Sequence, residues 1–186
     1  AGNFTTYAST NGANLWPYTN WQTAAADIQN AVAAQIYAGG IVLVSNGYYA
    51  SGGRAVYDTL TNRIVITNAI TVMSLNGPDE TVISGLGPMG PLGVRCAWLG
   101  DRARLTGFTL TGGHTRVTTG DLEQGTMGGG VWCTSTKAVI SNCTITGCSA
   151  ARAGGGSYRG MLLNSRVTGN RSSIDGGGAC FGIMAG

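Results

Sequence analysis

Charged side chains are scarce in this sequence of 186 residues, because aspartate, glutamate, lysine and arginine together make up only 10% of it, against roughly 25% in an ordinary soluble domain. The formal net charge is +3 and the charges are scattered, so nucleic acid is not an expected partner. The single histidine has no cysteine pair near it in the sequence, which predicts no zinc or other metal site. No run of about 18 apolar residues occurs, so no membrane span is expected.

A phosphate-binding loop is also lacking. The stretch GLGPMG (85–90) has the spacing GxGxxG, but Pro91 and a β-like run follow it instead of a helix. A dinucleotide-binding loop needs a helix N-terminus at that point to hold the pyrophosphate. The triple glycines of the sequence lack the Lys-Ser/Thr of a phosphate loop. We therefore expect no cofactor.

Short runs rich in valine, isoleucine and threonine fill most of the chain after residue 40, and glycine and asparagine separate them. Such runs are typical of β-strands. Three of them, LTGFTLTG (105–112), ISNCTITG (140–147) and LLNSRVTG (162–169), align on their final Thr-Gly pair. The alignment gives two apolar columns: Leu105, Ile140 and Leu162, and Leu110, Ile145 and Val167.

Triple glycines recur in the same part of the chain. They comprise Gly128, Gly129, Gly130, Gly154, Gly155, Gly156, Gly176, Gly177 and Gly178. Because glycine tolerates tight bends without a Cβ atom, we interpret each triple as a corner of a repeating coil. In the aligned repeats Asn142 lies over Asn164, which predicts a ladder of stacked amides.

The two last repeats and the two last glycine triples both recur after 22 residues, which indicates a solenoid of about 22 residues per turn. We predict an all-β fold, with parallel strands from residue 41 to 186 and an insertion loop at 112–127. Residues 1–22 are expected to form an extended arm. Residues 23–40 are expected to form the one helix, with Thr23 as N-cap, an apolar face of Ala25, Ile28, Val32 and Ile36, and its end at Gly39-Gly40.

Four stretches resemble right-handed parallel β-helix proteins of the pectin-lyase-like superfamily, in particular exported or surface repeat proteins of bacteria. They are PYTNWQTAAADIQNAV (17–32), VLVSNGYYASGGR (42–54), TNRIVITNAITVMSLNGPDETVISG (61–85) and GGGVWC (128–133). The resemblance runs from about residue 7 to the end and implies a β-helix capped by an N-terminal helix. It does not imply one activity, because the superfamily contains lyases, hydrolases, adhesins and tail spikes.

Carbohydrate-cleaving β-helix enzymes gather several carboxylates on neighbouring turns. The acids of this chain are Asp27, Asp58, Asp79, Glu80, Asp101, Asp121, Glu123 and Asp175, and no column of the repeat stacks two of them. The NxD, DD and GHG motifs of the hydrolases are absent, although GGHT (112–115) is similar to the last. The sequence therefore predicts no catalytic residue.

Two sets of residues could still form a binding site. His114, Arg116, Asp121 and Glu123 share the insertion loop, where they could form a site or only keep the loop solvated. Trp16, Trp21, Trp98 and Trp132 could stack on sugars, although aromatic residues of such modules more often pack a cap or a turn.

The five cysteines permit two interpretations. They could be small buried hydrophobic residues, or Cys96, Cys133, Cys143 and Cys148 could contribute one or two disulfides in an exported protein. Aligning GVRC (93–96) with GVWC (130–133) places Cys133 over Cys96, which would let that column hold a disulfide.

The stretch GGGACFGIMAG (176–186) begins a coil without completing it. An open coil end exposes strand edges and apolar side chains. Either the sequence is a piece of a longer β-helix, or the next copy of the chain covers the open end. We expect the second, a non-catalytic structural protein, extracellular or at the cell surface, that stacks head-to-tail on further copies of itself into a fibre. The alternatives are a glycan-binding surface or adhesin module and, less favoured, a polysaccharide lyase or hydrolase.

Overall fold

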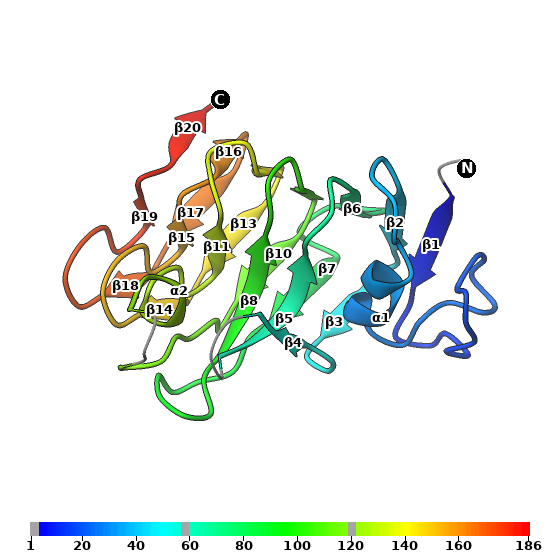
Figure 1. Ribbon diagram of the computed structural model, residues 1–186, viewed down its shortest axis with the longest axis horizontal. Helices are drawn as coiled ribbons and strands as arrows, with labels where there is room; N and C mark the ends of the chain where they lie inside the picture. Colours follow the sequence, from blue (N-terminus) through cyan, green and yellow to red (C-terminus); the bar gives the residue numbers. More distant parts are fainter. Residues whose placement is uncertain (1–3, 57–59, 119–121) are drawn as a thin grey trace.

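The structure, a computed structural model, describes residues 4–56, 60–118 and 122–186. Figure 1 shows stacked strands, with the N-terminal strands at one end of the molecule and the C-terminal strands at the other. Most of the regular structure is β-strand, as the short valine-, isoleucine- and threonine-rich runs predict. Within the described ranges, no helix is long and apolar enough to cross a membrane.

The strands form three large sheets and a small one. The first sheet has the order β1 (Thr5–Ala8), β2 (Ile41–Val44), β6 (Thr71–Ser74), β9 (Arg104–Thr106), β12 (Val139–Ser141), β16 (Met161–Leu163) and β20 (Ile183–Ala185). The second has the order β17 (Arg166–Thr168), β13 (Thr144–Thr146), β10 (Thr109–Thr111), β7 (Thr81–Ser84) and β3 (Gly47–Tyr49). The third has the order β19 (Ala179–Cys180), β15 (Ser157–Tyr158), β11 (Val131–Cys133), β8 (Val94–Leu99), β5 (Thr61–Ile66) and β4 (Arg54–Ala55). The small sheet pairs β14 (Ser149–Ala150) with β18 (Arg171–Ser172).

The chain passes through the large sheets in a fixed order. After β2 it visits the second sheet, the third and again the first, and it repeats this circuit to β20. Named strands pair in parallel throughout the described residues, except β4 with β5, which are antiparallel. Each strand thus lies beside its counterpart from the circuit before.

The strand register confirms the apolar columns of the sequence alignment. Ile140 pairs with Leu105 on one side and Leu162 on the other, and the second column is likewise in register. The predicted spacing of 22 residues holds only for the last two circuits. Paired strands of the first sheet place residues 41, 71, 104, 139, 161 and 183 side by side, because the earlier circuits carry longer loops.

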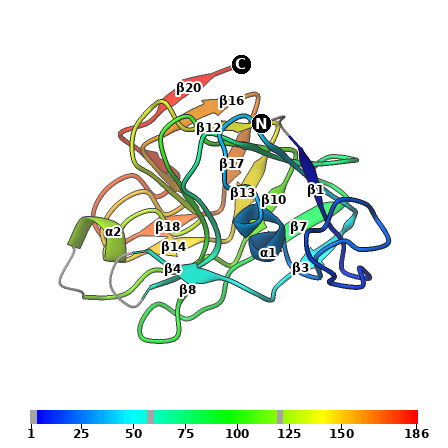
Figure 2. The same ribbon diagram turned by 45° about the vertical axis from the view of Figure 1, so that its right-hand side comes forward.

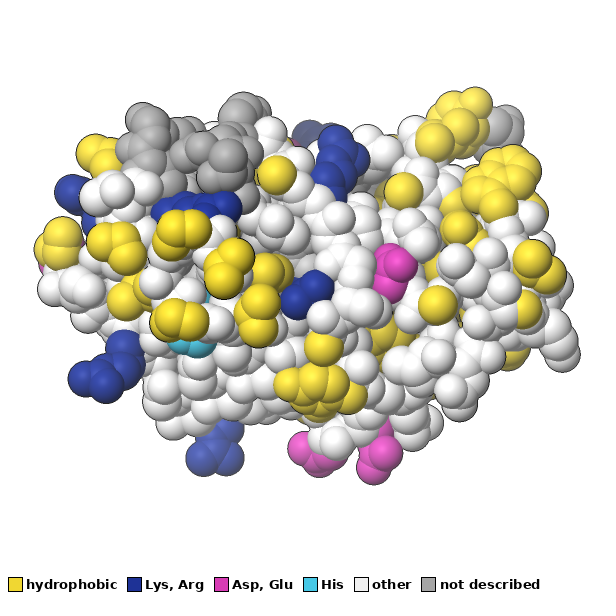
Figure 3. All heavy atoms as spheres, turned by 90° about the horizontal axis from the view of Figure 1, so that it is seen from below, with side chains coloured by type: hydrophobic (Ala, Val, Ile, Leu, Met, Phe, Trp, Pro, Cys, Tyr) yellow, Lys and Arg dark blue, Asp and Glu magenta, His cyan; other side chains and the backbone are white. Residues whose placement is uncertain are grey.

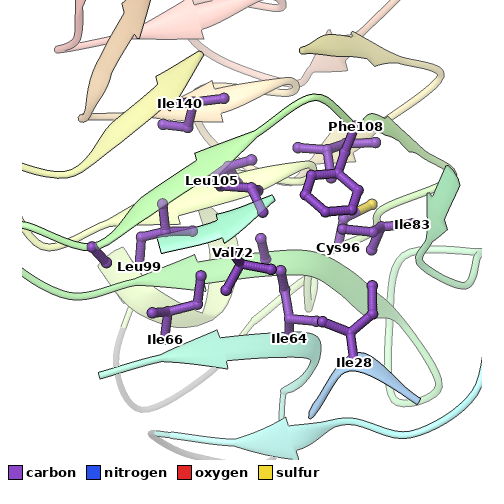
Figure 4. Packing of buried hydrophobic residues seen from close by; sticks show 14 of the residues in the cluster. Ile28, Ile64, Ile66, Val72, Ile83, Cys96, Leu99, Leu105, Phe108 and Ile140 are labelled. Atoms are coloured by element: carbon purple, nitrogen blue, oxygen red, sulfur yellow. The ribbon is translucent and has the colours of Figure 1, made fainter. Parts of the chain in front are cut away.

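One hydrophobic core lies between the three large sheets. Figure 4 shows side chains of the first sheet, such as Val72 and Leu105, meeting those of the second and third, such as Ile83 and Ile64. All four are fully buried. Each buried aliphatic side chain stabilises the fold by about 1.5–3 kcal/mol.

Helix α1 (Ile28–Ala33) covers the N-terminal end of this core and is much shorter than the predicted helix over 23–40. Its N-cap is Asp27, not Thr23, and the Asp27 carboxylate accepts a hydrogen bond from the Asn30 N–H at 2.8 Å. The helix ends at Ala33, and the side-chain amide of Gln35 then turns inward to donate to the carbonyl oxygens of Phe4 and Ile41. These bonds end the helix before Gly39-Gly40. Ile36 is consequently 66% exposed and does not share the apolar face.

Residues 1–22 do not form a separate arm in the part that the structure describes, because β1 is the first strand of the seven-stranded sheet. The following loop folds back along the outer edge of β1. The Tyr7 N–H donates to the Tyr18 carbonyl at 2.8 Å, and the Tyr7 carbonyl accepts from the Ala25 N–H at 2.9 Å. The Ser9 N–H donates to the Ala25 carbonyl at 2.9 Å. The edge of β1 is thus covered.

A second short helix, α2 (Leu122–Thr126), lies in the predicted insertion, so the expectation of a single helix was wrong. Figure 2 shows α2 outside the strands, on the side of β14 and β18. It contains Gly125 and only five residues, so its stability depends on the contacts that it makes with the sheets.

Candidate functional site

An aromatic column runs along the outer face of the third sheet. The rings of Trp98 and Trp132 stack with centroids 5.6 Å apart, and Trp132 and Tyr158 stack at 6.5 Å. Phe181 meets Tyr158 edge-on at 5.8 Å. Because Trp98 and Trp132 are only 6% and 4% exposed, they cannot stack on a sugar, and that part of the glycan hypothesis is wrong.

The other two tryptophans lie in the loop that follows β1. Trp16 is 77% exposed and Trp21 is 37% exposed. The ring of Trp21 packs edge-on against Tyr7, with centroids 4.7 Å apart. An exposed Trp16 is therefore the remaining candidate platform for a ligand or a partner.

A buried arginine attaches the insertion to the third sheet. Arg95 is 1% exposed, and its guanidinium donates to the carbonyl oxygens of Gly128 at 2.6 Å, Met127 at 2.7 Å and Gln124, and to Asn62 Oδ1 at 2.8 Å. These acceptors are neutral, so burial lowers the pKa of Arg95 to about 9. The buried Arg95 side chain thus attaches the insertion to the third sheet, and the sequence analysis did not predict this contact.

The residues of the insertion that could have formed a site have separate partners. His114 pairs with Ser149 in a β-bridge, and its Nδ1 lies 2.9 Å from the Gly112 carbonyl oxygen. Arg116 donates to the Gly90 carbonyl at 3.0 Å, and Glu123 forms an ion pair with Arg159 at 2.8 Å. The fourth member, Asp121, lies outside the described residues. The contacts of the three described members are thus with different partners.

A shallow hollow of about 400 Å³ lies beside the small sheet. It is lined by Met89, Ser149, Ala150, Arg171, Ser172 and Ser173. Hydroxyl groups and one guanidinium can bind a polar or anionic group, but this lining holds no carboxylate. The hollow therefore lacks the pair of acids that glycoside hydrolysis uses.

Several of the described carboxylates serve local structure. Asp27 caps α1, Glu123 pairs with Arg159, and Asp101 accepts hydrogen bonds from the hydroxyls of Ser135 and Thr134. These last bonds lower the pKa of Asp101. Asp58 lies outside the described residues. Within the described ranges, no three His, Cys, Asp or Glu side chains gather where they could hold a metal ion.

The glycine triples lie where the backbones of consecutive circuits come into close contact. The first glycine of each triple has a positive φ, +67° at Gly128, +62° at Gly154 and +54° at Gly176. A Cβ atom at Gly130 would lie 2.5 Å from the Gly156 carbonyl oxygen. The triples thus combine a bend with close backbone contact, and no ligand is needed to explain them.

Asn142 and Asn164 are exposed and have positive φ values of 48° and 46°. Asparagine tolerates this left-handed conformation better than most residues. No hydrogen bond joins the two side-chain amides in the described structure, so the predicted amide ladder is wrong. Asparagine recurs at these two positions because the backbone of the bend has a positive φ there.

The cysteines are free thiols in the structure, and Cys96, Cys133, Cys143 and Cys148 are buried. Cys133 pairs with Leu99 and not with Cys96, so the predicted Cys133–Cys96 column is wrong by three residues. The Cys143 thiol donates to the Ser141 carbonyl at 3.2 Å.

The two ends of the molecule differ. At the head, by which we mean the loop after β1 together with the segment that follows α1, the most exposed apolar side chains are Leu15, Trp16, Ile36 and Tyr37. Figure 3 shows hydrophobic side chains gathered at that end, on the right. At the tail, by which we mean β19 and β20, Phe181, Ile183 and Met184 are 74%, 44% and 61% exposed. The tail strands are edges of their sheets, whereas the edge of β1 is covered.

The chain matches no protein-family model, and no curated protein is significantly similar to it.

Proposed function

We propose that the protein is a right-handed parallel β-helix of the pectin-lyase-like type. The repeated passage through three sheets, the parallel pairing and the common core support this fold. A right hand is expected because crossover connections between parallel strands are almost always right-handed. In the same proposal the protein is extracellular or at the cell surface, which rests on the resemblance to exported repeat proteins. Protease treatment of intact source cells would remove the protein if this location holds, and a fully protected protein would contradict it.

The proposed function is that of a non-catalytic structural protein whose copies stack head-to-tail into a fibre. The observation that carries the proposal is the exposure of apolar side chains at both ends of one elongated stack of strands. Trp16 is 77% exposed at the head, and Phe181 is 74% exposed at the tail. A contact between two different ends of the same chain does not close on itself, so it generates a filament.

The contact at the head involves side chains and not strand pairing. Tyr7 and Ser9 already use their outward main-chain groups within the chain, so the first sheet does not continue into a second copy. Leu15 and Trp16 of one copy instead cover Phe181 and Met184 of the next. The remaining, polar residues of the loop between β1 and α1 then cover the open edge of β20.

Static light scattering and electron microscopy of the purified chain over a range of concentrations test this proposal. We expect filaments that become longer as the concentration rises. Trp16→Asp and Phe181→Asp should each abolish them, because each places a charge in the same contact. Leu92→Asp is the matched control, because Leu92 is 75% exposed but lies in the loop between β7 and β8.

Two results would overturn head-to-tail stacking. A strictly monomeric protein at high concentration would remove the assembly altogether. A closed dimer that Phe181→Asp disrupts and Trp16→Asp leaves intact would show that tail pairs with tail.

The non-catalytic part of the proposal has its own test. Asp27 caps α1, Glu123 pairs with Arg159 and Asp101 accepts hydrogen bonds from two hydroxyls, and no carboxylate lines the hollow beside the small sheet. Incubation with pectate, alginate and xylan should therefore release neither reducing nor unsaturated sugar ends. Release of either kind of end that scales with protein concentration would contradict this.

A further inference from the structure

Two thiols that are far apart in the sequence meet in the core. Cys96 lies on β8 of the third sheet, and Cys148 lies between β13 of the second sheet and β14 of the small sheet. Both are 0% exposed. The Cys96 thiol donates to the Thr111 carbonyl oxygen at 3.2 Å, the Cys148 thiol donates to the Thr146 carbonyl oxygen at 3.4 Å, and Thr111 and Thr146 are register neighbours on β10 and β13. The pair therefore sits at the corner where the second sheet passes into the third.

Two glycines make room for this contact. The Ala97 N–H donates to the Gly130 carbonyl, which makes Gly130 the neighbour of Cys96 in the next circuit. A Cβ atom at Gly130 would lie 3.2 Å from Cys148 Sγ, and one at Gly113 would lie 2.9 Å from Cys96 Sγ. Larger residues at either position would push the sulfur atoms away from where they lie.

The other buried thiols have different neighbours. Cys143 Sγ donates to the Ser141 carbonyl and lies 3.4 Å from the Phe108 nitrogen, whose N–H it accepts. Cys133 Sγ lies 2.8 Å from the position of a Cβ at Gly160. Among the disulfides that the sequence leaves open, the structure therefore favours the one between Cys96 and Cys148.

We propose that Cys96 and Cys148 form a disulfide bond when the chain folds in the presence of a small-molecule disulfide such as oxidised glutathione. The Cys148 thiolate attacks one sulfur of glutathione disulfide, and one glutathione thiolate leaves. The Cys96 thiolate then attacks the Cys148 sulfur of the mixed disulfide, and the second glutathione thiolate leaves. The two cysteine protons end on the two released glutathione thiolates, so glutathione disulfide is reduced and the cysteine pair is oxidised.

The two steps balance equally with the roles of Cys96 and Cys148 exchanged, because neither sulfur has its folded environment in the unfolded chain. Because both thiols are fully buried in the folded chain, the oxidant reaches them before the core closes. The bond then joins two circuits of the chain across a corner of the core.

Refolding of the full reduced chain from denaturant in a glutathione redox buffer tests the proposal. Remaining thiols are then alkylated, and the intact mass and the proteolytic peptides are measured. We expect a protein lighter by two hydrogen atoms before alkylation, three alkylated cysteines and one cross-linked peptide pair containing Cys96 and Cys148. The urea midpoint of the oxidised chain should be higher than that of the reduced chain, and dithiothreitol should reverse the shift.

Matched alanine variants complete the experiment. Cys148→Ala should abolish the cross-linked peptide and the urea shift, whereas Cys143→Ala, another buried cysteine, should keep both; circular dichroism verifies that each variant folds. Five alkylated cysteines in the refolded wild-type chain would overturn the proposal, as would a bond from Cys96 to any other cysteine. Peptide mapping reads the bond directly, so the result does not depend on whether copies stack.

Discussion

The indole of Trp132 lies nearly parallel to that of Trp98, with ring centroids 5.6 Å apart and 15° between the ring planes. The two residues are register neighbours on β11 and β8. The stack lies on the outer face of the third sheet, yet both rings are almost completely buried. The outer face of this sheet is therefore a second packed layer, separate from the core between the sheets.

Truncation of this stack should be costly. We expect Trp132→Ala to lower the free energy of unfolding by about 3–5 kcal/mol, because it removes a buried aromatic side chain and leaves a cavity. Trp16→Ala, at an exposed tryptophan, should change it by less than about 0.5 kcal/mol. Urea denaturation followed by circular dichroism measures both, and equal losses would show that the column contributes little.

Removal of the Arg95 guanidinium should release the insertion. In Arg95→Met the carbonyl oxygens of Gln124, Met127 and Gly128 lose their donor, at a cost of about 1–3 kcal/mol for a buried group left unpaired. Hydrogen exchange of the α2 amides should become faster. Arg104→Met, at an exposed position of β9, is the control. Unchanged exchange in α2 would mean that other contacts hold the insertion.

The same substitution at the third glycine of two triples should lower stability in one case and leave it unchanged in the other. Gly130→Ala places a Cβ 2.5 Å from the Gly156 carbonyl oxygen, and we expect a loss of about 1–3 kcal/mol from overpacking. Gly178→Ala places it 3.5 Å from a Val167 methyl group, an ordinary contact, so stability should stay within about 0.5 kcal/mol. Thermal unfolding of the two variants compares them directly. Similar melting temperatures would contradict the close approach of consecutive circuits.

Alkaline pH should destabilise the fold through its buried thiols. Burial raises the pKa of Cys143 from 9.0 to about 11, so between these values the folded chain binds more protons than the unfolded chain. The contribution of Cys143 to stability is complete below pH 9 and falls by about 3 kcal/mol as the pH rises to 11. Cys143→Ala should therefore flatten the stability curve between pH 9 and 11 relative to Cys180→Ala. Identical slopes would contradict this assignment.

Thiol labelling of the reduced, folded chain should separate Cys180 from the other cysteines. Cys180 is partly exposed, whereas the remaining four are buried. We expect dithionitrobenzoate to react with one thiol rapidly and with the others only as fast as the chain unfolds. The Cys180→Ala variant should lack the fast phase. A second fast-reacting thiol would show that a part of the core opens readily.

The strand register was predictable, because Leu105, Ile140 and Leu162 each precede a Thr-Gly pair at the same distance. The Thr-Gly pairs are a local signal in the sequence, and parallel pairing then places equivalent positions of neighbouring strands side by side. The length of α1 was not predictable, since the inward turn of Gln35 ends it through contacts with distant main chain.

The packed outer layer was missed for a similar reason. Burial of Trp98 depends on the insertion, which lies far from it in the sequence and is attached by Arg95. One signal was available: Trp132 and Tyr158 each stand two residues after a glycine triple. That common position indicated an aromatic column, which the interpretation of the tryptophans as a sugar platform overlooked.

The covered edge of β1 and the open edge of β20 make the fold extendable in one direction only. Tandem duplication of a 22-residue unit, such as the one that separates Met161 from Ile183, would add one more layer beside β20 and leave the α1 cap untouched. A duplication at the other end would have to displace Tyr18 and Ala25 from their bonds to Tyr7. Insertion of a further circuit without breaking these main-chain bonds is therefore confined to the C-terminal side of β1.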